Sequence, residues 1–245
     1  RLNFKISMCL FYKKISKIIP VSYTALDQIK MMSKKIPPVK VIFNGVDYNF
    51  FNDNKSKQFN NGTPQLIFIG GLRRYKKIDE LINAMPKLLL KYPKANLQII
   101  GDGPEFSKLS KIINEKKLHE SVELIGKQDK QQISLRLSSA DIYVSASRFE
   151  TFALPSLEAM ASGLPVVLSE HPAHRELIER SSAGKIFSYE NTSELCMKIE
   201  EVFENKEDFS IKAKNFAMNN DWDYVTRQII EVYQEVFDDY NVRCD

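Results

Sequence analysis

Short apolar runs alternate with amphipathic segments from about residue 65 onward. Short apolar runs bounded by turn residues are typical of buried strands, and apolar residues at i, i+3, i+4 and i+7 are typical of helices. We therefore expect strands over residues 65–69, 96–100, 122–125, 141–146, 165–168 and 185–187. The intervening segments predict helices over residues 78–92, 104–117, 130–138, 155–162 and 173–179, with two or three more between 193 and 239.

This order of elements predicts the fold class, an α/β doubly wound parallel sheet of Rossmann-like type. Strands separated by helices of this length pair in parallel, and their ligands bind at the carboxyl ends of the strands. Pro86 falls inside the helix predicted over residues 78–92, where we expect it to kink or split the helix.

The first 60 residues follow a different pattern. Residues 18–21 and 39–43 have the composition of strands around a helix, and residues 52–64 read as a polar linker. A segment this short buries little core of its own, so we interpret residues 1–60 as the remnant of a preceding domain and its linker. The doubly wound domain then covers residues 61–220, and a C-terminal helix covers residues 221–245.

Composition and charge narrow the classes of function. The chain has 245 residues, of which 43% are hydrophobic and 27% charged, as is usual for a folded globular protein. Its net charge of +4 suits an anionic small molecule or an anionic membrane surface, but it is too small to indicate nucleic acid.

Cysteines and histidines are too sparse for a disulfide framework or a metal cluster. Three scattered cysteines favour a reducing cytoplasm, and we interpret His171 and His174 as surface or loop residues without a metal. No apolar run near the start approaches the roughly 20 residues that span a membrane. Residues 2–19 mix lysines with apolar residues, which indicates a helix of the preceding domain, with a membrane-surface helix as the alternative.

The strongest candidate for chemistry is the segment 140–167, in which a predicted strand ends at a loop and a helix follows. Glu150 lies in that loop, and Glu158 lies about one turn into the helix. A helix N-terminus has unpaired N–H groups and partial positive charge, so it is suited to a diphosphate, while carboxylates accept hydrogen bonds from sugar hydroxyls. Two acids eight residues apart are common, so the spacing alone decides little.

The residues around the two acids resemble a known family. Residues 150–167 match the E-x7-E motif of retaining, sugar-nucleotide-dependent glycosyltransferases of group 1 (family 4), which have the GT-B fold. The departures are Thr151 and Ala153, where the family usually has glycine or another small residue. Further matches at residues 41–47, 101–104, 176–178 and 183–184 extend the resemblance in family order over residues 18–237.

The resemblance also implies the roles of a basic segment after the first strand of the sheet. The family has G-R-L-x-x-x-K-G where this chain has residues 70–77, and its arginine and lysine neutralise the donor diphosphate. Lys76 falls on the family lysine, whereas Gly71 stands at the arginine position. Arg73 or Arg74 is the expected replacement, because a guanidinium on a flexible stem reaches phosphate in two-point contact.

The expected site follows residue by residue. The resemblance implies Glu150 and Lys76 as catalytic residues, with Glu158 on the ribose. Asp129 is a candidate for binding the base, with helix capping as the alternative. The remaining donor-binding residues expected from the resemblance are Arg73, Arg74, Gly70, Gly71, Thr151, Phe152, Ala153 and Leu154.

The resemblance thus implies the C-terminal half of a GT-B enzyme that transfers sugar from a UDP- or GDP-sugar to a glycan or lipid-linked acceptor. It implies retention of configuration, surface-polysaccharide synthesis, no metal or other cofactor, and a cytoplasmic location, with peripheral membrane contact left open. Because most of the acceptor-side domain is not in this sequence, a truncated nucleotide-sugar-binding or interaction domain without activity is the alternative. An NAD-dependent dehydrogenase is disfavoured, because Gly101-x-Gly103 is followed by Phe106 where a third glycine is needed. A sugar-nucleotide epimerase is disfavoured by the context of the two glutamates.

Overall fold

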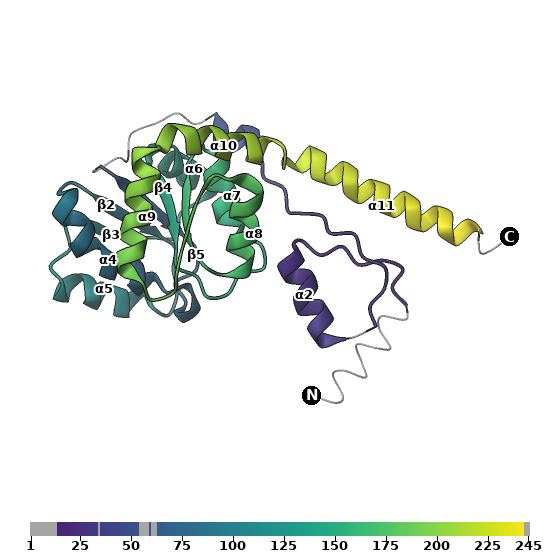
Figure 1. Ribbon diagram of the computed structural model, residues 1–245, viewed down its shortest axis with the longest axis horizontal. Coiled ribbons are helices and arrows are strands. Elements are labelled where there is room, and N and C mark those ends of the chain that lie inside the picture. Colours follow the sequence, from purple (N-terminus) through teal and green to yellow (C-terminus); the bar gives the residue numbers. More distant parts are fainter. Residues whose placement is uncertain (1–13, 34, 54–58, 60–62, 243–245) are drawn as a thin grey trace.

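The structure, a computed structural model, describes residues 14–33, 35–53, 59 and 63–242 (Figure 1). Its centre is a six-stranded sheet of order β3-β2-β1-β4-β5-β6 in which every pairing is parallel. The strands are β1 (Gln65–Ile69), β2 (Asn96–Ile100), β3 (Val122–Gly126), β4 (Ile142–Ser145), β5 (Val166–Ser169) and β6 (Gly184–Phe187). The doubly wound parallel sheet predicted from the sequence is confirmed.

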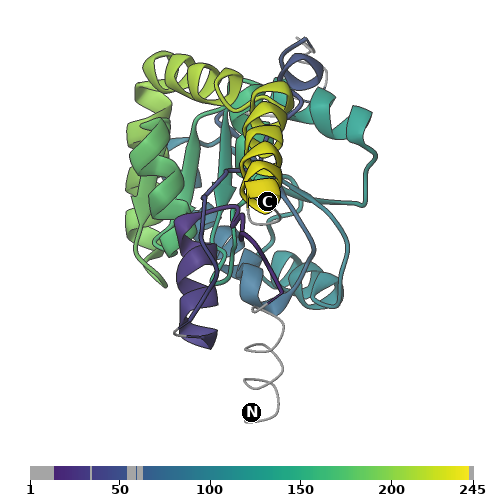
Figure 2. The same cartoon turned by 90° about the vertical axis from the view of Figure 1, so that its right-hand side faces the viewer.

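Helices cover both faces of this sheet (Figures 1 and 2). Alternate residues of β1 show why: Leu66 and Phe68 face one apolar cluster, whereas Ile67 and Ile69 face the other. The first cluster is completed by α4 (Ile78–Lys91), α5 (Phe106–Glu115) and α9 (Thr192–Glu204). The second is completed by α3 (Tyr48–Asn52), α6 (Lys130–Ser139), α7 (Leu154–Ala161), α8 (Pro172–Ser181) and α10 (Lys206–Met218).

Two local features differ from the expectation. Of the two outcomes expected at Pro86, the split does not occur: α4 is continuous over Ile78–Lys91, and the neighbours Met85 and Leu88 are anchored in the first cluster. Residues 18–21 and 39–43 do not form strands but meet in one isolated bridge between Ile18 and Val39. Among the described residues, these two segments pair with no strand of the sheet.

The N-terminal segment and the last helix pack together beside the sheet domain. Helix α2 (Tyr23–Met32) lies next to α8, and α11 (Trp222–Val242) extends away from the sheet (Figure 1). Ile42 of the N-terminal segment shares a small apolar cluster with Val225 and Val232 of α11. The polar linker and the segment 2–19 lie mainly outside the described residues, so the predictions on them remain predictions.

The junction at residues 44–48 is held against the start of α11. Glycine is needed at position 45, because an added Cβ would lie only 2.7 Å from the Trp222 ring. Val46 accepts a hydrogen bond from the Trp222 N–H at 3.1 Å, and Val46 and Phe51 pack in the second cluster of the sheet domain. Apolar contacts with that domain therefore begin before residue 60, while the proposed division at 60 and 220 stays a prediction.

Candidate functional site

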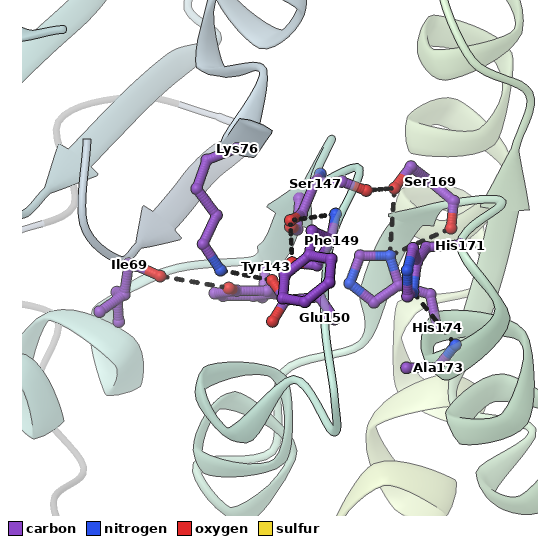
Figure 3. Close-up of polar contacts among 11 residues, drawn as sticks. Ile69, Lys76, Tyr143, Ser147, Phe149, Glu150, Ser169, His171, Ala173 and His174 are labelled. Atoms are coloured by element: carbon purple, nitrogen blue, oxygen red, sulfur yellow. Dashed lines mark hydrogen bonds and ion pairs between the residues drawn. The ribbon is translucent and has the colours of Figure 1, made fainter. Parts of the chain in front are cut away.

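The order of strands reverses between β1 and β4. At such a reversal the loops after the two strands diverge, and the carboxyl edge of the sheet is where a ligand crevice is expected. Lys76 comes from the loop after β1, and Glu150 comes from the loop after β4. The Lys76 Nζ lies 2.5 Å from Glu150 Oε1, and each side chain is 15% exposed (Figure 3). The two predicted catalytic residues, 74 positions apart, are thus brought together.

A second set of contacts holds these two loops in place. The Arg148 N–H donates to the Tyr75 carbonyl at 2.7 Å, which joins the loop of Glu150 to the loop of Lys76. The Arg148 guanidinium contacts Glu80 at 2.5 Å and lies 3.8 Å from the centre of the Tyr189 ring. Because Arg148 is itself fixed on two sides, the separation of the two loops is fixed as well.

The glycines after β2 allow the loop of Lys76 to sit where it does. The Leu72 N–H donates to the Asp102 carbonyl at 2.9 Å, so the two loops pack backbone to backbone. A Cβ on Gly101 would lie 1.9 Å from the Gly70 carbonyl oxygen, and one on Gly103 would lie 2.5 Å from that of Leu72. Side chains at these two positions are therefore excluded, which gives the G-x-G-P turn a structural reason.

The start of α7 presents backbone donors beside the ion pair. Ala153 has φ 68° and ψ 52°, in the left-handed region, and the helix proper begins at Leu154 with Pro155 in its first turn. Among the described residues no acceptor bonds the N–H groups of Phe152 and Ala153, although both residues are buried. N–H groups at a helix start that have no acceptor in the protein are free to bind an anion, so this loop is suited to an anionic ligand.

Glu158 lies inside the first turns of α7 and is partly buried. Burial raises the pKa of Glu158, and the nearby Lys130 ammonium opposes that rise. Lys130 is itself paired with Asp47 at 2.9 Å. The Glu158 carboxyl therefore accepts a proton more readily than an exposed glutamate, while its oxygens remain available to hydroxyl groups.

Tyr143 is a buried residue of β4 that joins this strand to β1. Its hydroxyl donates to the Ile69 carbonyl at 3.4 Å (Figure 3). Burial raises the pKa of Tyr143, and the carboxylates of Glu150 and Glu158 raise it further. The phenol therefore stays neutral beneath the charged pair.

The expectation that His171 and His174 are surface or loop residues is wrong for His174, which lies inside α8 and is 0% exposed; His171 does lie in the loop before α8, as its N-cap, but is only 7% exposed. They lie at the start of α8, on the β5 side of the crevice (Figure 3). His171 Nδ1 accepts from the Ala173 N–H at 3.2 Å, so the proton of the neutral ring is on Nε2. Burial lowers the pKa of His171, and the Glu150 carboxylate opposes that fall.

His174 is fixed by the loops behind Glu150. The Ser169 hydroxyl donates to the Ser147 carbonyl at 2.6 Å, so its one proton is used there. His174 Nδ1, 3.1 Å from the Ser169 carbonyl, must then be the donor of that contact. Its Nε2 is buried without a partner among the described residues, and burial lowers the pKa of His174 to about 3.

The other predicted donor-binding residues are distributed around this crevice. Arg73 and Arg74 are exposed and form no ion pair with the described residues. An added Cβ on Gly71 would meet only the Asp102 carbonyl, at 4.0 Å. Asp129 caps α6 by accepting from the Gln132 N–H at 2.8 Å, which is the structural role kept open as the alternative. Gly70, Thr151 and Leu154 lie at the ends of the two loops, with Thr151 and Leu154 exposed.

The comparison with known families is decisive at this point. A family described as glycosyl transferases group 1 matches residues 49–220, which is most of the chain. The chain belongs to the group 1 glycosyltransferases. Its architecture is that of the C-terminal half of a GT-B enzyme, as the resemblance implied.

Individual group 1 relatives are similar over part of their length. An uncharacterized glycosyltransferase of Methanocaldococcus jannaschii is 27% identical over 233 residues, which cover 89% of this chain and 60% of the relative. Alpha-monoglucosyldiacylglycerol synthase of Acholeplasma laidlawii is 28% identical over 149 residues, covering 61% and 37%. The chain thus spans about half the length of the curated relatives it matches.

Solved structures share the fold of this group 1 chain. Anabaena HepE in complex with UDP and glucose superposes with a TM-score of 0.83 at 22% identity, covering 96% of this chain and 67% of HepE. Staphylococcus aureus TarM superposes with a TM-score of 0.77 at 24% identity, covering 92% of this chain and 44% of TarM. At these identities the likeness establishes the fold alone.

Some residues that shape this group 1 site were not found from the sequence. Tyr143 reads as one more apolar residue of a strand, and Arg148 reads as a surface charge. His171 carries one signal that was available, since it directly precedes Pro172, and a residue before a first-turn proline is a natural helix cap. In the described part of the chain no three His, Cys, Asp or Glu side chains come together as metal ligands. None of the described helices is long and apolar enough to cross a membrane.

Proposed function

We propose that this chain is the donor-binding half of a retaining glycosyltransferase that moves a sugar from a UDP- or GDP-sugar to a glycan or lipid-linked acceptor. The observation that carries the proposal is the Lys76–Glu150 pair at the reversal of strand order, next to the unbonded N–H groups of Phe152 and Ala153. A cation, a carboxylate and free backbone donors at one crevice are the groups that a sugar diphosphate needs.

Each group has a distinct part in the proposed reaction. The leaving diphosphate gains negative charge as the bond to the sugar breaks, and Lys76 with the Phe152 and Ala153 N–H groups stabilises that charge. Glu150 accepts from hydroxyls of the donor sugar, and Glu158 accepts from the ribose. Arg73 or Arg74 supplies a second cation, and Asp129 lies on the base side.

The ligand-free ion pair is compatible with these parts. A half-buried ion pair contributes little net stability, because loss of hydration offsets most of the attraction between its charges. Lys76 can therefore exchange Glu150 for a phosphate oxygen at small cost. That exchange frees the Glu150 carboxylate for the sugar, so one event prepares both groups.

Relatives support the class of donor and of acceptor. HepE of Anabaena has been crystallised with UDP-glucose, and the pneumococcal O-GlcNAc transferase GtfA with UDP and GlcNAc. The name of the Acholeplasma relative indicates a glycosylated diacylglycerol product. These names favour a UDP-sugar over a GDP-sugar and leave a lipid-linked acceptor open here. Surface-polysaccharide synthesis, a cytoplasmic site and contact with a membrane face belong to the same proposal.

A second candidate function is donor binding without transfer. It needs only the groups of the proposed donor site, which lie within the described residues. In this reading residues 1–60 are the end of an acceptor-side domain, residues 61–220 bind the donor, and residues 221–245 pack back toward that acceptor-side domain. Both candidates require the same donor site, so donor binding is tested first.

Calorimetric titration with UDP, GDP, UDP-glucose and GDP-mannose tests the donor site. We expect saturable binding of one nucleotide and its sugar. Lys76→Met should weaken nucleotide binding by at least tenfold, since it removes a charge-assisted contact to phosphate. Lys108→Met removes an exposed lysine of α5 and serves as the matched control. Glu158→Gln should weaken binding of uridine as well as UDP, because its proposed partner is the ribose.

The outcomes separate the candidates. Absence of binding to all four ligands would overturn both functions and leave only the fold. Binding that survives Lys76→Met would remove Lys76 from the site. Binding by this chain, with hydrolysis or transfer of sugar only in a longer form of the protein, would favour the donor-binding half of an enzyme.

A further inference from the structure

Ser22 lies at the first turn of α2, far in sequence from the site, yet it contacts the loop between the two glutamates. Its hydroxyl donates to the Thr151 carbonyl at 2.5 Å and accepts from the Ala25 N–H at 2.9 Å. The residue is only 1% exposed. Both hydrogen-bonding capacities of this hydroxyl are therefore used, one for α2 and one for the loop that follows Glu150.

The contact with Thr151 determines the direction of the next N–H group. The Thr151 carbonyl and the Phe152 N–H belong to one planar trans peptide unit, so they point in opposite directions. With the carbonyl held by Ser22, the Phe152 N–H points away from α2. This is one of the two N–H groups in this loop that have no acceptor among the described residues.

We infer that Ser22 is a positioning residue of the donor site: by holding the Thr151 carbonyl, it aims the Phe152 N–H at the diphosphate of the donor. The inference rests on the proposed function, because it needs a diphosphate to be bound at this loop. It assigns a part in donor binding to the N-terminal segment, outside the region that the family match covers.

The Phe152 side chain is tied to the same segment by a separate set of contacts. Its ring lies 6.0 Å from the ring of Phe43, which in turn lies 6.1 Å from the ring of Tyr23. Main chain and side chain of Phe152 are thus both fixed by residues of the N-terminal segment. A peptide held at both ends is poorly able to rotate its N–H away from the ligand.

Ser22 is itself held against the sheet domain by α8. The Glu176 carboxylate accepts from the Tyr23 N–H at 3.0 Å and from the Thr24 N–H at 3.2 Å. A carboxylate at a helix N-terminus is favourable because the helix has partial positive charge there. Helix α2 lies beside α8 as a result (Figures 1 and 2), and Ser22 reaches Thr151 from a fixed start. A displacement of α2 would release the Thr151 carbonyl and weaken the donor site.

Three substitutions separate the two uses of the hydroxyl. Ser22→Ala removes both. Ser22→Asp keeps an acceptor for the Ala25 N–H but has no proton to give to Thr151 at neutral pH, whereas Ser22→Thr keeps both. Each variant of the full 245-residue chain is titrated with UDP and with uridine, and with GDP and guanosine in parallel. Thermal unfolding of each variant shows whether it is folded at the temperature of titration.

We expect Ser22→Ala and Ser22→Asp to bind the nucleoside diphosphate about tenfold more weakly than wild type, the effect of one misdirected contact to a charged group. Nucleoside affinity should stay within about twofold in all variants, and Ser22→Thr should match wild type for both ligands, because only the diphosphate needs the Phe152 N–H. Equal weakening for nucleoside and nucleoside diphosphate would mean a general structural role and would overturn the inference. Unchanged affinity in Ser22→Ala would overturn it while leaving the donor site intact. Absence of nucleotide binding by wild type would overturn the proposed function and this inference with it.

Discussion

At the scale of single residues, Ala153 occupies a backbone conformation that glycine adopts more easily. Its φ of 68° lies in the left-handed region, which costs a residue with a Cβ about 1–2 kcal/mol. Ala153→Gly should therefore be less destabilising than Ala159→Gly, in the same helix, by about 1–2 kcal/mol, since only the first relieves that strain. Urea unfolding of the two variants measures the difference. Equal losses of stability would show that Ala153 is unstrained.

Gly71 is another residue where this chain departs from its family, and the structure leaves room for the missing arginine. An added Cβ would meet nothing nearer than the Asp102 carbonyl at 4.0 Å. We expect Gly71→Arg to bind UDP about tenfold more tightly, because it adds a charge-assisted contact to the diphosphate. Gly71→Gln, of similar reach without charge, is the control in the same titration. If both variants bind like wild type while Arg73→Gln binds weakly, Arg73 already serves as the second cation.

The residues of the site differ in how far the sequence reveals them. Lys76 and Glu150 are visible because a motif fixes each of them next to the end of a strand, and the order of strands then makes them neighbours. The histidines could not be placed, because their spacing of three suits an exposed helix as well as a helix start. Their burial depends on the packing of α8 against the loop after β5. The residues next to the histidines in the sequence do not reveal these tertiary contacts.

At the scale of elements, His174 makes the junction of β5 and α8 sensitive to acid. Its pKa is lowered to about 3 in the folded chain, against 6.5 for an ordinary histidine. Below pH 6.5 the unfolded chain takes up a proton that the folded chain refuses, so stability falls as pH falls. The expected slope from this group is at most about 1.4 kcal/mol per pH unit between pH 6.5 and 3.

His174→Asn tests that slope, because asparagine keeps a donor near the position of Nδ1 and does not titrate. The free energy of unfolding is measured in urea at pH 7, 6 and 5 for both proteins. Wild type should lose more stability than the variant over this range, while His171, whose pKa is also lowered, contributes the same slope to both. Parallel curves for the two proteins would contradict a buried neutral His174.

Elements of the sheet domain follow from the sequence, as does a helix between residues 21 and 39, whereas the strands expected on either side of that helix do not form. Strands such as β1 and β5 are short apolar runs followed by a turn. A parallel sheet is covered by helices on both faces, so the residues on both sides of each strand must be apolar. Pro86 does not split α4 because packing outweighs local propensity: residues on both sides of it are anchored in the core, and the helix continues through it. The short helix α3 was missed for the opposite reason. Its five residues give too little periodicity to recognise.

At the scale of the whole molecule, the family match begins later in the chain than the packed structure does. The match begins at residue 49, whereas Ile42 and Val46 are already buried and α2 is fastened to α8. Composition could not reveal where the packed structure begins. Polar residues mark a linker, but the junction at residues 44–48 is held by main-chain hydrogen bonds to residues 220–222, which composition does not show. The chain is therefore two packed parts, in which the smaller part reaches the loop after Glu150 through Ser22.

The last helix, α11, packs against the N-terminal segment. Its buried and exposed faces allow a matched test of that packing. Val232 is 2% exposed and packs with Ile42, whereas its neighbour Tyr233 is 69% exposed. Val232→Asn places a polar group in the small cluster and should destabilise it by about 2–3 kcal/mol, since a buried amide without a partner is unfavourable. Tyr233→Asn should change little.

Because the cluster is small, we expect local opening rather than unfolding of the sheet domain. Brief trypsin digestion followed by mass spectrometry should show cleavage within residues 14–46 about thirtyfold faster in Val232→Asn, while β1 to β6 stay intact. Binding of UDP should weaken in the same variant with binding of uridine preserved, because α2 and Ser22 then lose their fixed position. Faster cleavage without weaker UDP binding would show that the small cluster and the donor loop are independent.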